Sequence, residues 1–409
     1  MNELDKKYAN LLVSVGLNVQ EGQTVLINAA PEHYEFVTLI TEQAYGKKAK
    51  QVIVKFTSEA ITRLDYLNQD VGTLTDVKQW EIDESLWQIE QDLCLLALRS
   101  PNPGLMDDVD SSKVTEKMQA YGKAMTKRRD YTMSSKGQWL VAAYPSVSWA
   151  QAVFPKLDDE EAYDKLYQAI LKASRVSEDN DPIKEWENHN AMLKGQNDKL
   201  NEYDFESLTF TNAMGTNITV GLVKGHQWGG GAKPALNGVN FNANIPTEES
   251  FTTPDRMNVN GIVYNSIALN NNGRLIDKFW LKFENGYVVD YDAEIGKEAL
   301  TKLLQTDDNS KRIGEIALVS YDSPISNMGI LFYNTLFDEN ASCHIALGQG
   351  YPLIEKGGLM SSEELLERGI NQSIIHVDFM FGTQDMKIVG RKFDGTMITI
   401  MENGNLTLV

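Results

Sequence analysis

The first half of the chain alternates short apolar runs with stretches that have the periodicity of helices. Four runs are rich in aliphatic and β-branched residues: Thr24–Asn28, Gln51–Phe56, Leu93–Leu98 and Trp139–Tyr144. Apolar strands separated by helices are typical of a parallel sheet that is covered on both faces. We therefore expect an α/β N-terminal domain with a mainly parallel sheet. An amphipathic helix is predicted at Asp158–Val176, because the three acids at its start favour a helix N-terminus.

The second half follows a different pattern, in which tight-turn dipeptides separate strand-like runs. The Asn-Gly and Asp-Gly pairs are Asn237-Gly238, Asn260-Gly261, Asn272-Gly273, Asn285-Gly286, Asn403-Gly404 and Asp394-Gly395. Such pairs are strong short-range signals for β-hairpins. The change of pattern indicates a domain boundary in the polar stretch at residues 185–205. We predict an α/β domain at residues 1–195 and a β-rich α+β domain at residues 196–409.

The length, charge and cysteine content of the chain exclude several classes of binding partner and location. A chain of 409 residues is long for a single hydrophobic core, and its net charge is -19. This charge disfavours both nucleic acid and an anionic membrane surface as partners. No apolar run approaches the length of a membrane span, and the first residues do not have the pattern of a secretory signal. Two cysteines form no disulfide framework, so we expect a cytoplasmic protein.

The five histidines can be considered one by one. His33 and His189 lie in polar helical stretches, where we expect them to be exposed and without a role. His226 lies in the loop KGHQWGGG, which lacks the residue order of a phosphate-binding loop. We interpret this loop as one beside a site, where His226 and Trp228 could contact substrate. Cys343 precedes His344, but neighbouring side chains diverge, so this pair is a poor candidate for nucleophilic catalysis.

His376 lies in the apolar run IIHVDFMF. In a strand, alternate residues share a face, so His376 and Asp378 are expected to point the same way. A carboxylate buried without a partner would be costly. A hydrogen bond between the two side chains, an arginine partner and a bound cation are three remedies that this segment leaves open.

Three further segments carry acids or histidines in apolar or tight surroundings. Glu315 lies in the apolar row of IGEIALV, and the segment FNANIPTEESFTTP carries Glu248 and Glu249. The segment LFDENASCHIALGQGYP carries Glu339, His344 and Tyr351.

Counting ligands connects these segments. A catalytic two-metal site needs about three protein ligands per ion, with one carboxylate shared. The residues that could supply them are Glu249, Glu315, His344, His376 and Asp378. They make six metal bonds if Glu315 bridges. The chain contains no HExxH or CxxC pattern, so a single-zinc protease or a zinc finger has no support.

The same segments resemble a known family, the bacterial two-metal aminopeptidases of the aminopeptidase T, aminopeptidase S and PepS group. The resemblance extends over nearly the whole chain. It is carried by NIPTEESFTTPDR (244–256), GEIALV (314–319), SPISNMGILFYNTLFDENASCHIALG (323–348), HVDFM (376–380), GTNITVGLVKGHQW (215–228) and SWAQAVFP (148–155). Ser250 stands where the family usually has a branched aliphatic residue, and GQGYP replaces a more usual small-residue run.

The resemblance implies roles for individual residues. The family's metal ligands fall on the five residues that the ligand count had isolated. Its catalytic tyrosine falls on Tyr351, and Glu339 becomes a further ligand or an acid that binds the substrate's α-amine. It also implies a homodimer that acts on short peptides in a β-rich, metal-binding catalytic domain.

We therefore expect a metalloaminopeptidase with two divalent ions, of zinc, cobalt, manganese or magnesium, and a bridging hydroxide as nucleophile. Glu248 is the candidate general base, and Tyr351 would donate to the oxyanion. One alternative is a dinuclear hydrolase of a phosphoester or a non-peptide amide. The segments are poor in the arginine or lysine that phosphate sites usually add, with only Arg256 and Arg312 nearby. A non-enzymatic structural metal site is the other alternative.

Overall fold

The computed structural model describes residues 1–408, which form two compact units. Unit 1 contains Met1–Asp110, Ala124–Met192 and Gly231–Thr247. Unit 2 contains Ser111–Lys123, Leu193–Gly230 and Glu248–Val409. Each unit is thus assembled from separate stretches of the chain. The division into two domains at residue 195 stays a prediction.

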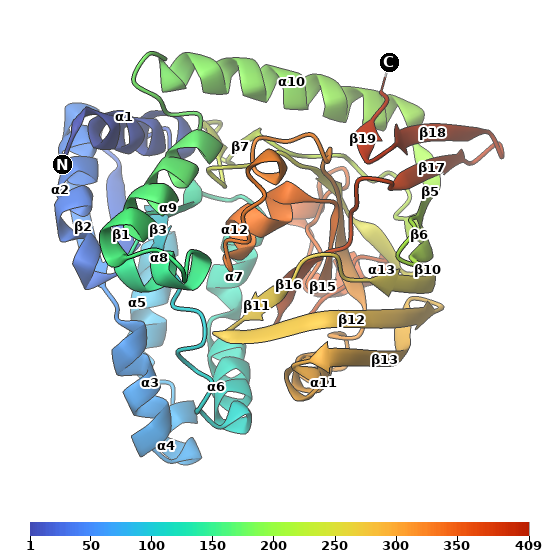
Figure 1. Ribbon diagram of the computed structural model, residues 1–409, viewed down its shortest axis with the longest axis horizontal. Helices are drawn as coiled ribbons and strands as arrows, with labels where there is room; N and C mark the ends of the chain where they lie inside the picture. The colour runs from blue at the N-terminus through green and yellow to red at the C-terminus, as the bar shows by residue number, and fades with distance from the viewer. Residues whose placement is uncertain (409) are drawn as a thin grey trace. The chain divides into compact units, whose positions relative to one another are not determined.

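Unit 1 is built on a parallel sheet with the strand order β2-β1-β3-β4. Its strands are β1 (Thr24–Ala29), β2 (Gln51–Phe56), β3 (Cys94–Arg99) and β4 (Trp139–Ala143). Its helices are α1 (Glu3–Leu11), α2 (Tyr34–Gly46), α3 (Glu59–Asn68), α4 (Val71–Thr75), α5 (Gln79–Glu90), α7 (Thr126–Met133), α8 (Val147–Val153) and α9 (Asp159–Ala173). Figure 1 shows the helices of this unit in blue to green, with α2 beside β1 and β2. The predicted α/β fold class is confirmed.

The start of α9 follows from the sequence. Asp158 caps the helix, because its side chain accepts a hydrogen bond from the Glu161 N–H. Three acids occupy the first turn, where the helix dipole favours negative charge. The predicted helix at this place is therefore present, and it ends at Ala173, three residues before the predicted end.

Unit 2 contains a nine-stranded sheet in the order β11-β12-β10-β6-β5-β17-β18-β19, with β13 paired to β12. Its strands are β5 (Phe205–Thr211), β6 (Asn217–Leu222), β10 (Pro254–Tyr264), β11 (Leu269–Asn271), β12 (Arg274–Glu284), β13 (Tyr287–Ile295), β17 (Lys387–Lys392), β18 (Met397–Glu402) and β19 (Asn405–Leu406). The helices of this unit are α6 (Ser111–Ala124), α11 (Lys297–Leu304), α12 (Thr335–Asp338) and α13 (Ser362–Glu367). The predicted β-rich character of the second half is confirmed. Helix α10 (Pro182–Tyr203) includes residues of both units.

Five of the six predicted tight turns connect strands. Four lie in unit 2 between β11 and β12, β12 and β13, β17 and β18, and β18 and β19. The fifth lies in unit 1, between β7 (Ala232–Pro234) and β8 (Asn240–Asn242). The turn predicted at Asn260-Gly261 is wrong, because this pair lies inside β10. A Cβ atom at Gly261 would stand 2.2 Å from the Asn217 carbonyl oxygen, so this glycine permits close strand approach.

A second, four-stranded antiparallel sheet of unit 2 has the order β16-β15-β14-β9. Its strands are β9 (Ser250–Thr252), β14 (Ile313–Leu318), β15 (His344–Gly348) and β16 (His376–Met380). One face of this sheet joins the large hydrophobic core of the unit through Ile316, Leu318, Ile345, Leu347 and Phe379. The residues between them in sequence point to the opposite face.

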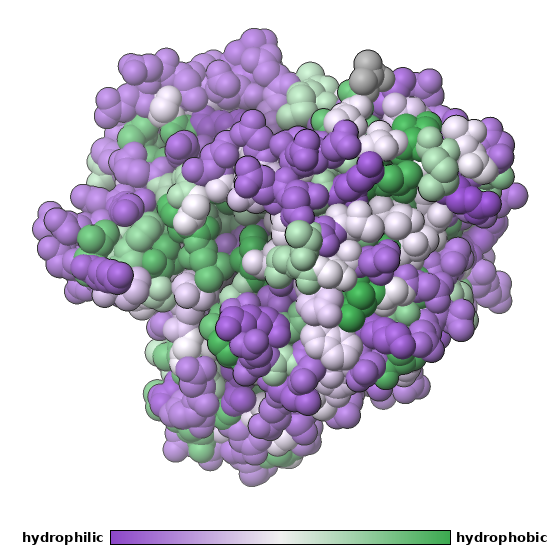
Figure 2. All heavy atoms as spheres, turned by 45° about the vertical axis from the view of Figure 1, so that its right-hand side comes forward, coloured by the Kyte–Doolittle hydropathy of each residue, from purple (hydrophilic) through white to green (hydrophobic). Residues whose placement is uncertain are grey.

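No helix within the described residues is long and apolar enough to cross a membrane. The face shown in Figure 2 is covered mainly by hydrophilic side chains, with hydrophobic residues between them.

Candidate metal centre

The candidate site lies on the polar face of the four-stranded sheet. Alternation along the strands places Glu315 of β14, His344 of β15, and His376 and Asp378 of β16 on this face. Glu249 immediately precedes β9, the fourth strand. Residues that are far apart in the sequence are thus brought together by strand pairing.

Small side chains separate the acids across the sheet. Ala346 is opposite Glu315 on one side and Asp378 on the other, and Gly348 is opposite His376. Directly opposite residues of antiparallel strands share a face, with Cβ atoms about 5 Å apart. A methyl group at position 346 and a hydrogen at 348 therefore leave room between the flanking carboxylates and imidazole.

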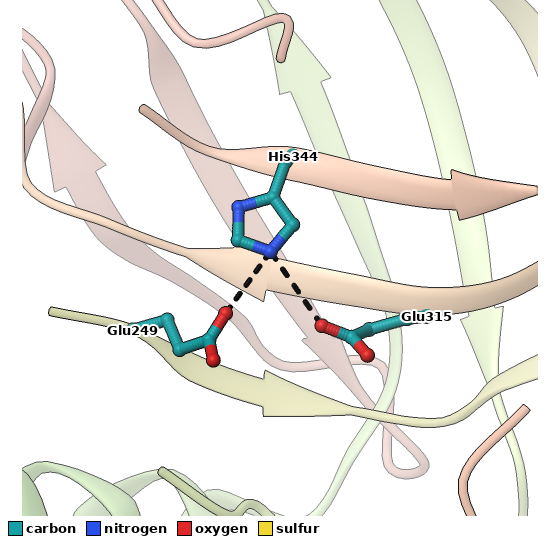
Figure 3. Close-up of side chains that lie close together, drawn as sticks. All are labelled: Glu249, Glu315 and His344. Atoms are coloured by element: carbon teal, nitrogen blue, oxygen red, sulfur yellow. Dashed lines mark ion pairs between the residues drawn. The ribbon is translucent and has the colours of Figure 1, made fainter. Parts of the chain in front are cut away.

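Glu249, Glu315 and His344 point toward one another (Figure 3). His344 Nε2 lies 3.0 Å from Glu249 Oε2 and 3.5 Å from Glu315 Oε1. The side chains are almost completely buried, with His344 only 1% exposed. These three residues form a first group whose donor atoms could hold one ion.

Glu315 also belongs to a second group, with His376 and Asp378. His376 Nε2 lies 3.6 Å from Glu315 Oε2 and 3.6 Å from Asp378 Oδ1. The two carboxylate oxygens of Glu315 therefore face different histidines. A third group of close donor atoms consists of Glu339, His344 and Asp378, so Glu339 lies at the same centre.

Backbone carbonyl groups fix which nitrogen of each histidine faces the centre. His344 Nδ1 lies 2.9 Å from the Glu339 carbonyl oxygen, and His376 Nδ1 lies 2.7 Å from the Gln349 carbonyl oxygen. A carbonyl only accepts, so Nδ1 must carry the proton in each ring. Nε2 of each neutral ring then keeps its lone pair for a cation.

Burial and mutual repulsion disturb the acids of the centre. Burial raises the pKa of Glu315 to about 7; hydrogen bonding to His344 opposes this rise, and the charges of Asp378 and Glu249 add to it. Burial, followed by the charges of Asp378 and Glu249, raises the pKa of Glu339 well above its usual value. Every ion pair recorded for these acids within residues 1–408 is to a histidine.

For the two histidines, burial and the neighbouring acids shift the pKa in opposite directions, and the acids prevail. Burial alone would lower the pKa of His344, but hydrogen bonds to Glu249 and Glu315 raise it well above its usual value. Burial likewise opposes the rise in the pKa of His376, which the charges of Asp378 and Glu315 produce. The centre thus attracts positive charge strongly.

The donor set fits divalent cations. Two ligands at about 2.1 Å from a tetrahedral ion are about 3.4 Å apart, close to the measured separations of 3.0, 3.5, 3.6 and 3.6 Å. Oδ1 of Asp378 is buried without a hydrogen bond, as expected of an oxygen reserved for an ion. Imidazole and carboxylate donors suit zinc, cobalt and manganese. The fold and these grouped donors define a candidate metal centre.

Tyr351 lies beside this centre. Its ring packs between Phe251 and His376, with both ring centroids 5.3 Å away. The Thr253 hydroxyl donates to the Tyr351 carbonyl oxygen. Burial, followed by the charge of Glu315 and the other acids, raises the pKa of Tyr351 well above its usual value, so its phenol is a donor. The arrangement supports the predicted position of Tyr351 next to the ligands.

Glu248 lies next to the centre without belonging to any of the three donor groups found in the described chain. Its backbone N–H donates a 2.7 Å hydrogen bond to Asn340 Oδ1. The glycine-rich loop also approaches this segment, since a Cβ atom at Gly230 would stand 2.1 Å from the Glu249 carbonyl oxygen. The loop is therefore beside the site, and substrate contact by His226 and Trp228 stays a prediction.

Three sequence-based expectations need comment. The prediction that His33 and His189 are exposed is wrong, because both side chains are buried. Their local sequence could not predict this burial, because the residues that they contact are distant in the sequence. His33 packs edge-on against Tyr144, and His189 bonds to the Thr247 carbonyl oxygen. Burial raises the pKa of Cys343 to about 11, which argues further against a nucleophilic thiol.

Comparison with known proteins adds independent information. A family model described as thermophilic metalloprotease (M29) matches residues 1–406. Aminopeptidase 2 of Geobacillus stearothermophilus is 43% identical over 404 residues, covering 98% of this chain and 97% of that protein. Aminopeptidase AmpS of Bacillus subtilis is 43% identical over 399 residues, with 97% of each covered. The structure of wild-type AmpT from Thermus thermophilus has a TM-score of 0.89 at 35% identity, with 99% of each chain covered.

The chain therefore belongs to the thermophilic metalloprotease (M29) family. The family inferred from the sequence is confirmed, and so is the class of enzyme, a metal-dependent aminopeptidase. The roles of individual residues, the number of ions and the dimer are not tested by these likenesses and stay predictions.

Proposed function

We propose that this protein removes N-terminal amino acids from short peptides at a dinuclear metal centre. The observation that carries the proposal is the position of Glu315, whose two oxygens face two histidines. Glu249 and His344 would complete one set of ligands around it, and His376 and Asp378 the other. Glu339 would serve as a further ligand or bind the α-amine of the substrate.

Two divalent ions at these ligands would polarise the scissile carbonyl and lower the pKa of a bound water. Glu248 accepts the proton of the attacking water. As the water oxygen bonds to the carbonyl carbon and the C–N bond breaks, Glu248 passes this proton to the leaving amine. Tyr351 donates a hydrogen bond to the oxygen on which negative charge develops.

The acidity of the centre favours a substrate with a free α-ammonium group. Glu339, when it is not a ligand, could pair with a cation of this kind, and a buried pair of opposite charges restricts the position of both. The enzyme should therefore reject peptides whose amine is acetylated.

A comparison of leucine-p-nitroanilide with its N-acetylated form tests the proposal. We expect hydrolysis of the free amine at least a hundred times faster, by kcat/KM. Equal rates on both substrates would contradict an aminopeptidase. No observation favours a phosphoesterase, since Arg256 bonds to Asn309 and Arg312 to the Arg256 carbonyl oxygen.

A further inference from the structure

Asn340 links two separate segments of the candidate site. It lies in the short 3-10 turn Glu339–Ala341 and is completely buried, at 0% exposure. Its Oδ1 accepts the Glu248 N–H at 2.7 Å, across 92 positions of sequence. Its Nδ2 donates to the Leu336 carbonyl oxygen at 2.9 Å and lies 3.5 Å from Glu339 Oε1.

The hydrogen-bond partners fix the orientation of this carboxamide. The Glu248 N–H can only donate, and the Leu336 carbonyl can only accept. Reversing the amide would place donor against donor and acceptor against acceptor. The Asn340 carboxamide is thus held by the Leu336 carbonyl of α12, and it presents a fixed acceptor to the segment that carries Glu248 and Glu249.

The segment that carries Glu248 and Glu249 also contacts the glycine-rich loop. The Glu249 carbonyl oxygen is so close to Gly230 that a Cβ atom there would be 2.1 Å away. Glu249 is followed by β9, whose Phe251 exchanges backbone hydrogen bonds with Gly229. The backbone of Glu249 is therefore held by the glycine-rich loop, whereas the N–H of Glu248 is held by Asn340.

We propose that Asn340 is a positioning residue for the reaction, which sets the place of the Glu248 carboxylate relative to the metal ligands. This inference rests on the proposed role of Glu248 as the general base. Proton transfer requires the base within hydrogen-bond reach of the water, and a displacement of about 1 Å can cost on the order of a hundredfold in rate. Asn340 acts through Glu248 and does not contact the reacting atoms.

Two substitutions separate the local contact from the long-range one. Asn340→Ala removes the side-chain hydrogen bonds to the Glu248 N–H, the Leu336 carbonyl oxygen and Glu339 Oε1. Asn340→Ser shortens the side chain so that it no longer reaches Glu248, but a serine hydroxyl can still donate to the carbonyl four residues earlier, here that of Leu336. Both variants should lower kcat about 10- to 100-fold, with KM and bound metal within about threefold of the wild type. Asn340→Ser should also keep a melting temperature near that of the wild type.

Asn334 provides a matched control. It lies in the same segment, is also buried, and its Oδ1 accepts the Leu336 N–H as a helix cap. Its hydrogen bonds to Leu336 and Asp338 stay within its own turn. Asn334→Ala should lower the melting temperature while kcat stays within about threefold of the wild type.

A double-mutant cycle is the decisive experiment. If Asn340 acts through Glu248, adding Asn340→Ser to Glu248→Gln should change kcat by less than about threefold, because the affected group is already absent. Multiplied losses in the double variant, or wild-type kcat in Asn340→Ser, would overturn the positioning role. A Glu248→Gln variant with wild-type kcat would instead remove the base itself, and with it the proposed mechanism.

Discussion

The buried carboxylate of Glu315 predicts how the metal-free protein responds to pH. In the folded chain, burial and neighbouring acids raise the pKa of Glu315 from 4.5 to about 7. Protonated Glu315 then contributes stability that is fully present below pH 4.5 and is lost as the pH rises through 7. A shift of this size corresponds to about 3 kcal/mol, at about 1.4 kcal/mol for each pKa unit.

Glu315→Gln isolates this contribution, because a glutamine of similar shape cannot ionise. After complete chelation, the free energy of unfolding of the wild type should fall relative to that of the variant by about 2–3 kcal/mol between pH 5 and pH 8. At about 2 °C for each kcal/mol, the difference in melting temperature should change by about 5 °C. Differential scanning calorimetry of both proteins at several pH values measures it.

Glu355→Gln serves as the control, since Glu355 lies on the surface with a side chain that is 85% exposed. It should show the same pH dependence as the wild type. Parallel curves for Glu315→Gln and the wild type would refute the reasoning that a buried, repelled carboxylate exists in the metal-free centre. Added zinc should stabilise the wild type most at high pH, because ions and protons compete for the same donor atoms.

Three substitutions test other parts of the centre. Tyr351→Phe should lower kcat on the order of a hundredfold with unchanged metal content. The control Tyr321→Phe, at the surface, should leave kcat unchanged. Steady-state kinetics and mass spectrometry of bound metal measure both quantities. Ala346→Val should fill the space between Glu315 and Asp378, so that the chain folds but binds less metal. Overpacking should lower the free energy of unfolding by about 1–3 kcal/mol. Normal metal content, measured by mass spectrometry, would contradict this geometry. His376→Ala should bind one ion per chain in place of two, and retention of two ions by mass spectrometry would remove His376 from the ligands.

Local sequence patterns predicted the fold class and many elements. β2 begins and ends where the apolar run predicted, because its β-branched residues favour a strand even at the edge of the sheet, where none of them is buried. The two-residue alternation also placed His376 and Asp378 on one face of β16. The turn predicted at Asn260-Gly261 is wrong, because Gly261 lies inside β10. There the missing side chain lets the neighbouring strand approach closely.

Contacts between residues that are distant in the sequence could not be predicted from such local patterns. Glu249, Glu315 and His344 could be counted as ligands, but only the strand order placed them next to one another. Nothing in the sequence distinguishes Asn340 from any other asparagine in a turn, since its partner lies 92 residues away. The burial of His33 and His189 depended on distant partners for the same reason.

The number of ions that activity requires is the most direct test of the dinuclear centre. Chelated protein should be titrated with zinc, cobalt or manganese while bound metal and leucine-p-nitroanilide hydrolysis are followed together. We predict no activity without metal and full activity at two ions per chain. Full activity at a single ion per chain, or in protein free of metal, would contradict a centre in which Glu315 is shared by two ions.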